Sequence, residues 1–97
     1  MKIYRQGDVL IKQVTDIPAG LKTSKDNVLV YGESTGHAHR LQGGSVKTKG
    51  DEMYIIADDG AKIVHEEHDT IELMKGRYAV IRQREYLSAD MTRLVID

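Results

Sequence analysis

The sequence contains no cysteine, no phenylalanine and no tryptophan, and it has a single proline, Pro18. Without cysteine the chain cannot form disulfides, thiolate metal sites or iron–sulfur clusters, and a cysteine nucleophile is excluded. The core must be built from valine, isoleucine, leucine and methionine, with five tyrosines as the only large rings. The absence of cysteine fits a reducing compartment, and we expect a cytoplasmic protein.

The sequence also lacks an excess of charge, because 14 basic and 15 acidic residues leave a net charge of −1. Proteins that bind nucleic acids or membranes generally carry a basic excess, so neither partner is favoured. No apolar run reaches the length of a signal peptide core or a transmembrane helix, and we expect neither. A chain of 97 residues can bury one core, which predicts a single domain over residues 1–97.

Short apolar and β-branched runs recur along the chain, separated by turns that contain glycine or aspartate. Runs at such close spacing are typical of an all-β sandwich or barrel, and no stretch keeps a helical period over three turns. We therefore predict a small all-β barrel or sandwich with little or no helix. The predicted turns span residues 6–8, 42–45, 49–51 and 58–60, and the last is an Asp-Gly hairpin.

All four histidines lie in two short runs, and the first run contains His37 and His39. On a strand, residues two apart point to the same face, so these two imidazoles project together. A same-face pair of neutral imidazoles is half of a site for a divalent transition metal such as zinc, iron, manganese or nickel. The first run therefore predicts half of a metal centre.

The second run contains His65 and His68, which are three residues apart. In a flat strand they point to opposite faces, and His65 then shares its face with Glu67. Both histidines reach one ion only if Glu66 and Glu67 form a turn or a bulge. We predict Glu67 as a catalytic carboxylate, and a metal-free polar site or no joint site at all are the alternatives. The predicted metal ligands are His37, His39, His65 and His68.

The longest predicted strand, residues 78–86, ends in a charged run that offers two further catalytic candidates, Arg84 and Glu85. If Ile81 faces the core, alternation carries Glu85 into the mouth of the barrel, where it could fix a histidine tautomer. The opposite phase turns Arg82 and Arg84 inward, ready for a phosphate or a carboxylate. A solvated strand face with surface ion pairs is the third interpretation.

One set of motifs consists of Gly36-His37-Ala38-His39, Gly43-Gly44 and the late Gly76. This set resembles a reduced cupin barrel. Cupins place a His-x-His pair with a later acid and histidine on inward-facing strands around one metal. The resemblance implies a cupin-like metal site in which His65 or His68 takes the place of the later histidine. Gln42 stands near the position of the cupin glutamate.

A second set covers most of the chain: Arg5-Gln6-Gly7-Asp8-Val9, Thr35-Gly36-His37-Ala38-His39, His65-Glu66-Glu67-His68 and Gln83-Arg84-Glu85-Tyr86. Together these motifs resemble a family of short, uncharacterised bacterial and phage proteins. The resemblance implies membership of that family and carries no established activity.

Three functions compete. The first is a small metal-binding β-barrel whose ion polarises an oxygen of a small or phosphate-bearing substrate or activates water. The sequence does not decide whether such a protein is an enzyme. The second is a metal-free histidine and arginine site that binds or cleaves RNA or a nucleotide. The third is a phage or host interaction module whose histidines cap turns, and an exposed edge strand could also pair two copies into a homodimer.

Overall fold

The fold is an antiparallel sheet of eight strands. The computed structural model describes residues 2–31 and 37–82, and these residues contain no helix, which confirms the predicted all-β class. No helix long and apolar enough to cross a membrane occurs in this part of the chain. The strands are β1 (Ile3–Gln6), β2 (Val9–Val14), β3 (Lys22–Thr23), β4 (Val28–Tyr31), β5 (Ala38–Lys49), β6 (Glu52–Val64), β7 (Ile71–Glu72) and β8 (Gly76–Arg82).

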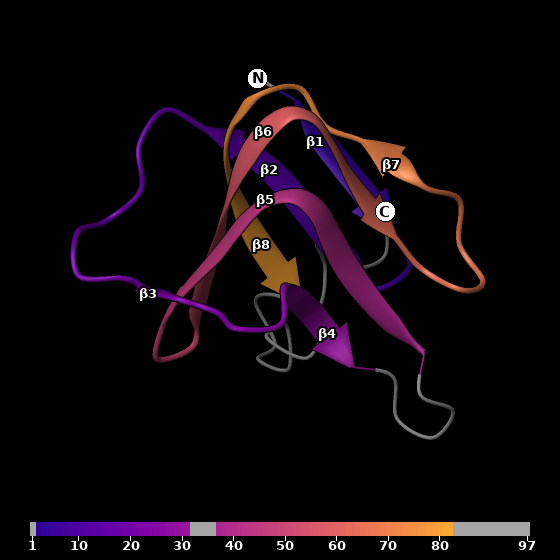
Figure 1. Cartoon of the computed structure of the whole chain (residues 1–97), viewed down its shortest axis with the longest axis horizontal. Coiled ribbons are helices and arrows are strands. Elements are labelled where there is room, and N and C mark those ends of the chain that lie inside the picture. Colours follow the sequence, from indigo (N-terminus) through magenta and orange to yellow (C-terminus); the bar gives the residue numbers. More distant parts are fainter. Residues whose placement is uncertain (1, 32–36, 83–97) are drawn as a thin grey trace, which may run out of the picture.

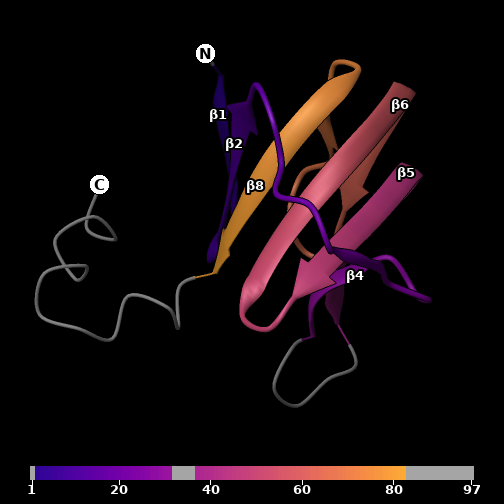
Figure 2. The ribbon, with the colours of Figure 1, turned by 90° about the vertical axis from the view of Figure 1, so that its left-hand side faces the viewer.

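The strands follow the spatial order β1-β2-β8-β6-β5-β3, while β4 pairs with β5 and β7 pairs with β6. Figure 2 shows β1, β2, β8, β6 and β5 side by side in this order. β1 and β3 are the two ends of the order and do not pair with each other. Strand pairing over the described residues therefore leaves the sheet open, and the predicted barrel is not closed.

β5 and β6 are longer than the sequence predicts, because neither strand breaks at the turns predicted within it. The turns predicted at 42–45 and 58–60 are wrong, since β5 runs through the first range and β6 through the second. Figure 1 shows the two strands as long, arched ribbons that lie side by side. The turn predicted at 49–51 is confirmed, and it joins these two strands.

A large β-bulge takes the place of the two wrong turns. Gln42 pairs with Lys62, and the next pair on the far side of the bulge is Gly44 with Ala57. One residue of β5 therefore stands opposite four residues of β6, numbers 58–61. Extra residues on one strand bend a hairpin without ending it.

Glycine serves the bulge in two ways. Gly43 and Gly60 have φ angles of +83° and +80°, a conformation that glycine adopts without strain. Gly44 allows close approach of the strands, because a Cβ there would lie 2.3 Å from the carbonyl oxygen of Ile56. Positive φ is required by tight turns and by bulges alike, so the glycines alone did not distinguish the two.

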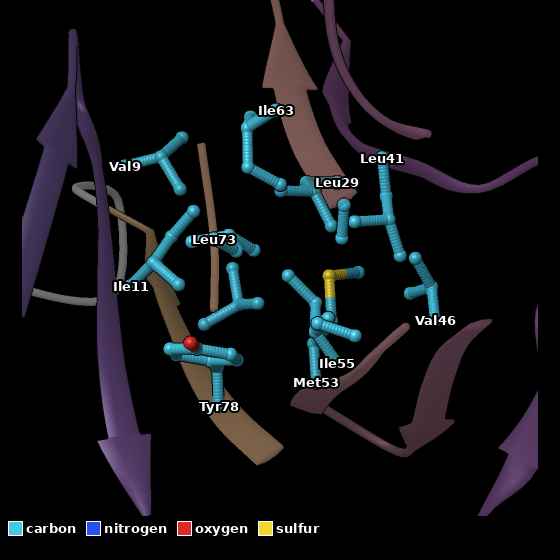
Figure 3. Close-up of a cluster of buried hydrophobic side chains, with 13 residues drawn as sticks. Val9, Ile11, Leu29, Leu41, Val46, Met53, Ile55, Ile63, Leu73 and Tyr78 are labelled. Atoms are coloured by element: carbon cyan, nitrogen blue, oxygen red, sulfur yellow. The ribbon is translucent and has the colours of Figure 1, made fainter. Parts of the chain in front are cut away.

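The core lies on the concave side of the bent sheet. Figure 3 shows its side chains converging from β2, β4, β5, β6 and β8. Aliphatic residues and one tyrosine fill it, as the absence of phenylalanine and tryptophan requires. Its labelled members are Val9, Ile11, Leu29, Leu41, Val46, Met53, Ile55, Ile63, Leu73 and Tyr78.

The side chains of β8 that face the core are the even-numbered ones. This is the opposite of the alternation that would bring Glu85 inward. Tyr78 and Val80 are 1% and 5% exposed, so the even-numbered side chains of β8 face the core. Ile81 lies on the other face and is half-buried. The interpretation in which Ile81 faces the core is therefore wrong.

Arg82, the next even-numbered residue, ties the end of β8 to a neighbouring turn. Its Nη2 donates a hydrogen bond to the carbonyl oxygen of Asp51, at 2.8 Å, on the turn between β5 and β6. This contact gives Arg82 a structural role. The predicted catalytic residues Arg84 and Glu85 lie outside the described residues.

Replacing Gly44 by alanine should destabilise the hairpin, because the added methyl group collides with the carbonyl oxygen of Ile56. Gly44 does not have a positive φ, so the collision acts without backbone strain. We expect a loss of roughly 1–3 kcal/mol in the free energy of unfolding, measured by urea denaturation. Ser45→Ala, which removes an atom, is the control, and equal stability of Gly44→Ala and the parent would contradict the close approach.

Candidate metal centre

The two histidine runs meet at one end of the core. His39 precedes the buried Leu41 by two residues, and His65 follows the buried Ile63 by two. Side chains alternate along a strand, so His39 and His65 continue the inward face beyond the last apolar residues. The cluster therefore occupies the mouth of the core rather than an outer face.

His65 is the hub of the cluster. Its ring centroid lies 4.3 Å from that of His39, 4.6 Å from that of His68 and 5.7 Å from that of His37. The rings of His39 and His68 are nearly parallel, with centroids 5.8 Å apart. Two imidazoles bound to one ion at about 2.0–2.1 Å have ring centres roughly 5 Å apart, and the four separations lie near this value.

A bend after β6 brings the second histidine run together. β6 ends at Val64, and residues 66–68 form the bend that the sequence requires for His65 and His68 to share a site. His37 lies just before β5 and makes its ring contact with His65, while no described ring contact joins it to His39. The structure thus brings all four rings together through His65.

Gln6, at the end of β1, is the residue of this region that the sequence did not single out. Gln6 and His39 are the only buried polar side chains among the described residues, at 2% and 7% exposure. Oε1 of Gln6 lies 2.7 Å from Nδ1 of His39, and its Nε2 donates to the carbonyl oxygens of Ile63 and Asp69. The only signal was its place in the motif 5–9, which we interpreted as a turn.

That turn is confirmed, and it also touches the cluster. Gly7 has a φ of +57°, and a Cβ on it would lie 2.7 Å from Nε2 of His68. A side chain at this position would strain the turn and collide with the imidazole. Gly7 therefore allows the β1–β2 turn to lie against the exposed side of the cluster.

Glu66 fastens the loop of the second run to β5. Its Oε1 accepts a hydrogen bond from the backbone N–H of Ala38 at 3.0 Å, and its Oε2 forms an ion pair with Arg40 at 3.0 Å. The hydrogen bond from Ala38, with further help from Arg40, lowers the pKa of Glu66 to about 2. The carboxylate is therefore ionised and holds the loop beside His37 and His39.

Among the described residues, the side chains whose possible ligand atoms all lie within 4.8 Å of one another are His37, His65 and Glu66, and His39 and His68 do not belong to this group. Both oxygens of Glu66 already have partners, so we assign it a positioning role. Nδ1 of His65 accepts the backbone N–H of Glu67 at 3.0 Å. The side chain of Glu67, a predicted catalytic residue, is 68% exposed and approaches Nδ1 of His37 at 3.6 Å.

The surroundings of His39 disfavour its charged form. Burial, together with the nearby His65 and His68, lowers the pKa of His39 to about 4, against a smaller upward effect of Asp8 and Glu66. At neutral pH its imidazole is uncharged, which is the form that binds a metal ion.

A family model described as a domain of unknown function (DUF8820) matches residues 5–83. The matched range includes Gln6 and both histidine runs. No curated protein and no solved structure matches the chain. The resemblance to cupins therefore stays a hypothesis, and Gln42, near the position of the cupin glutamate, is exposed on β5 rather than turned to the cluster.

The stability of the metal-free protein should fall as the pH is lowered from 7 to 4. The unfolded state takes up a proton on His39 near pH 6.5 and the folded state only near its pKa of about 4, so the unfolded state binds more protons between these values. We expect a loss of roughly 2–3 kcal/mol from this group in urea unfolding with chelator present. An NMR titration in which His39 ionises near pH 6.5 would contradict this assignment.

Glu66 should stabilise the fold only where it is ionised. Its folded pKa of about 2 lies below the ordinary value of 4.5, so its contribution is present above pH 4.5 and is lost as the pH falls towards 2. Glu66→Gln should therefore lose less stability than the parent between pH 5 and pH 2. Glu67→Gln is the matched neighbouring control, and the idea fails if both variants follow the parent curve.

Proposed function

We propose that this chain, which belongs to the DUF8820 family, binds one divalent transition-metal ion at its four-histidine cluster. His65 is the central ligand, with His39 and His68 beside it and His37 on its other flank. Binding through His65 requires that its Nδ1 release the N–H of Glu67 or that its Nε2 give up a proton. The predicted identities, zinc, iron, manganese and nickel, all accept imidazole nitrogen as a ligand. Glu66 and Gln6 hold the ligands in place.

The observation that carries the proposal is the convergence of rings from two distant segments. The two histidine runs are separated by 25 intervening residues, numbers 40–64, and all four rings contact one another through His65. Imidazoles that merely cap turns have no reason to gather in this way. Clustered rings that can become charged also repel one another, and a bound cation replaces that repulsion with coordination.

The arrangement has a closed side and an open side. His39 is buried at the mouth of the core, whereas His68 and Glu67 are exposed. An ion bound between them would keep a solvent-facing position for water or for an oxygen of a small or phosphate-bearing ligand. Bound there, such an ion supplies a Lewis acid. Glu67 is the carboxylate of the cluster that we assign to proton transfer.

A metal-free site for RNA or a nucleotide is the competing function. That function assigns the phosphate to Arg82 and Arg84, of which Arg82 donates to the carbonyl oxygen of Asp51 on the β5–β6 turn and Arg84 lies outside the described residues. The arginine described beside the histidines, Arg40, is paired with Glu66. Binding of RNA that persists in chelator and weakens with salt would favour this alternative over the metal site.

Untagged protein should bind about one equivalent of zinc per chain, measured by elemental analysis and isothermal titration calorimetry. His65→Ala should weaken zinc binding by roughly 100-fold or more, because it removes the ligand that the other three rings share. Lys62→Gln, an exposed change on β6, is the control and should leave the affinity unchanged.

Two results would overturn the proposal. One is a stoichiometry well below one equivalent for every metal tried after reloading. The other is unchanged zinc affinity in His65→Ala, since an ion bound elsewhere would not depend on this ring.

A further inference from the structure

The amide of Gln6 makes three hydrogen bonds to three different segments. Oε1 lies 2.7 Å from Nδ1 of His39 on β5. Nε2 lies 3.1 Å from the carbonyl oxygen of Ile63 at the end of β6 and 2.8 Å from that of Asp69 after the loop. The side chain is 2% exposed, so water does not compete for these contacts.

These contacts fix which way the amide of Gln6 faces. The amide nitrogen has two N–H groups, and the carbonyl oxygens of Ile63 and Asp69 accept one each. Turning the amide by 180° would place its oxygen against two carbonyl oxygens, with no proton between them. The oxygen of Gln6 must therefore face His39.

The orientation of the amide in turn fixes the proton on His39. A carbonyl oxygen only accepts hydrogen bonds, so Nδ1 of His39 must be the donor. In a neutral imidazole the other nitrogen, Nε2, then carries the lone pair. Two backbone carbonyl groups thus orient one amide, and that amide sets which nitrogen of His39 carries the lone pair.

We infer that Gln6 is a positioning residue, which holds His39 in the Nδ1–H tautomer and so assigns Nε2 as the atom that binds an ion at the cluster. The part of this inference that concerns an ion rests on the proposed function, whereas the part that concerns the tautomer does not. Gln6 also fixes both ends of the loop that carries His65 and His68, so a single amide aligns ligands from both runs.

The first experiment uses the unmodified, metal-free protein at pH 7.5. A long-range proton–nitrogen NMR spectrum distinguishes a protonated ring nitrogen from one that carries a lone pair. We expect Nδ1 of His39 to be protonated and Nε2 not to be. A spectrum of the Nε2–H tautomer, or of a rapidly exchanging mixture, would overturn the inference whether or not the protein binds a metal.

The second experiment separates positioning from simple packing. Gln6→Met keeps a side chain of similar length but removes the acceptor, so the Nδ1–H preference of His39 should be lost. Gln6→Glu keeps an acceptor facing Nδ1 but sets a carboxylate oxygen against the carbonyl oxygens of Ile63 and Asp69, so this preference should survive while the stability of the fold falls. Gln42→Met makes the same change at an exposed glutamine on β5 and should leave the tautomer unaltered.

Zinc titration then tests the ligand role with the same variants. Gln6→Met should lower zinc affinity about 10- to 100-fold, the usual effect of losing a partner of a metal-bound histidine, and Gln6→Glu should lose less. Equal losses in both variants, with the His39 tautomer unchanged in both, would assign Gln6 a packing role only and overturn the inference. Absence of zinc binding in the parent would refute the proposed function, while the tautomer spectrum would still decide the role of Gln6.

Discussion

The hydrogen bond between Gln6 and His39, the two buried polar side chains of the described structure, is the constraint on which the candidate site depends. Each lies where the apolar core ends, and a buried polar group without a partner would cost about 1–3 kcal/mol. The amide of Gln6 gives a hydrogen-bond partner to Nδ1 of His39 and to the carbonyl oxygens of Ile63 and Asp69. This one amide therefore lets three segments meet without leaving a buried polar group unpaired: β1, β5 and the loop after β6.

The bulge between β5 and β6 supplies the other half of the geometry. Before the bend, β6 pairs with β8 through residues 54–57, and beyond it the strand pairs with β7. β5 divides in the same way, because its residues 38–40 pair with β4 and residues 47–48 pair with β3. The bend folds this part of the hairpin over the core, so that both histidine runs arrive at its mouth beside the β1–β2 turn.

Sequence patterns predicted the strands and the histidine segments correctly. They failed where the same residue pattern suits two different structures. Alternating apolar residues predicted the strands, and the spacing of the histidines identified the segments that meet. Gly43 and Gly60 indicated positive φ, but turn and bulge share that requirement, so the prediction of two turns was wrong. Gln6 was missed because its role comes from two carbonyl groups about 60 residues away in the chain. Glu85, predicted to fix a tautomer, lies outside the described residues.

The loop that carries His65 and His68 is held by two contacts of opposite chemical character, and burial explains the difference. Inside, the partner is the neutral amide of Gln6, since a buried carboxylate facing two carbonyl groups would be both desolvated and repelled. On the exposed side, the loop is held by the charged side chain of Glu66, which contacts the backbone N–H of Ala38 and the side chain of Arg40. Water there offsets the cost of keeping the carboxylate ionised. Because the inner contact is neutral, the polar side chains buried at this end of the described core are the amide of Gln6 and the imidazole of His39, and neither is a carboxylate. The negative charge of the region lies on its exposed side. The cluster therefore has a neutral imidazole on the side of the core and carboxylates on the side of the solvent.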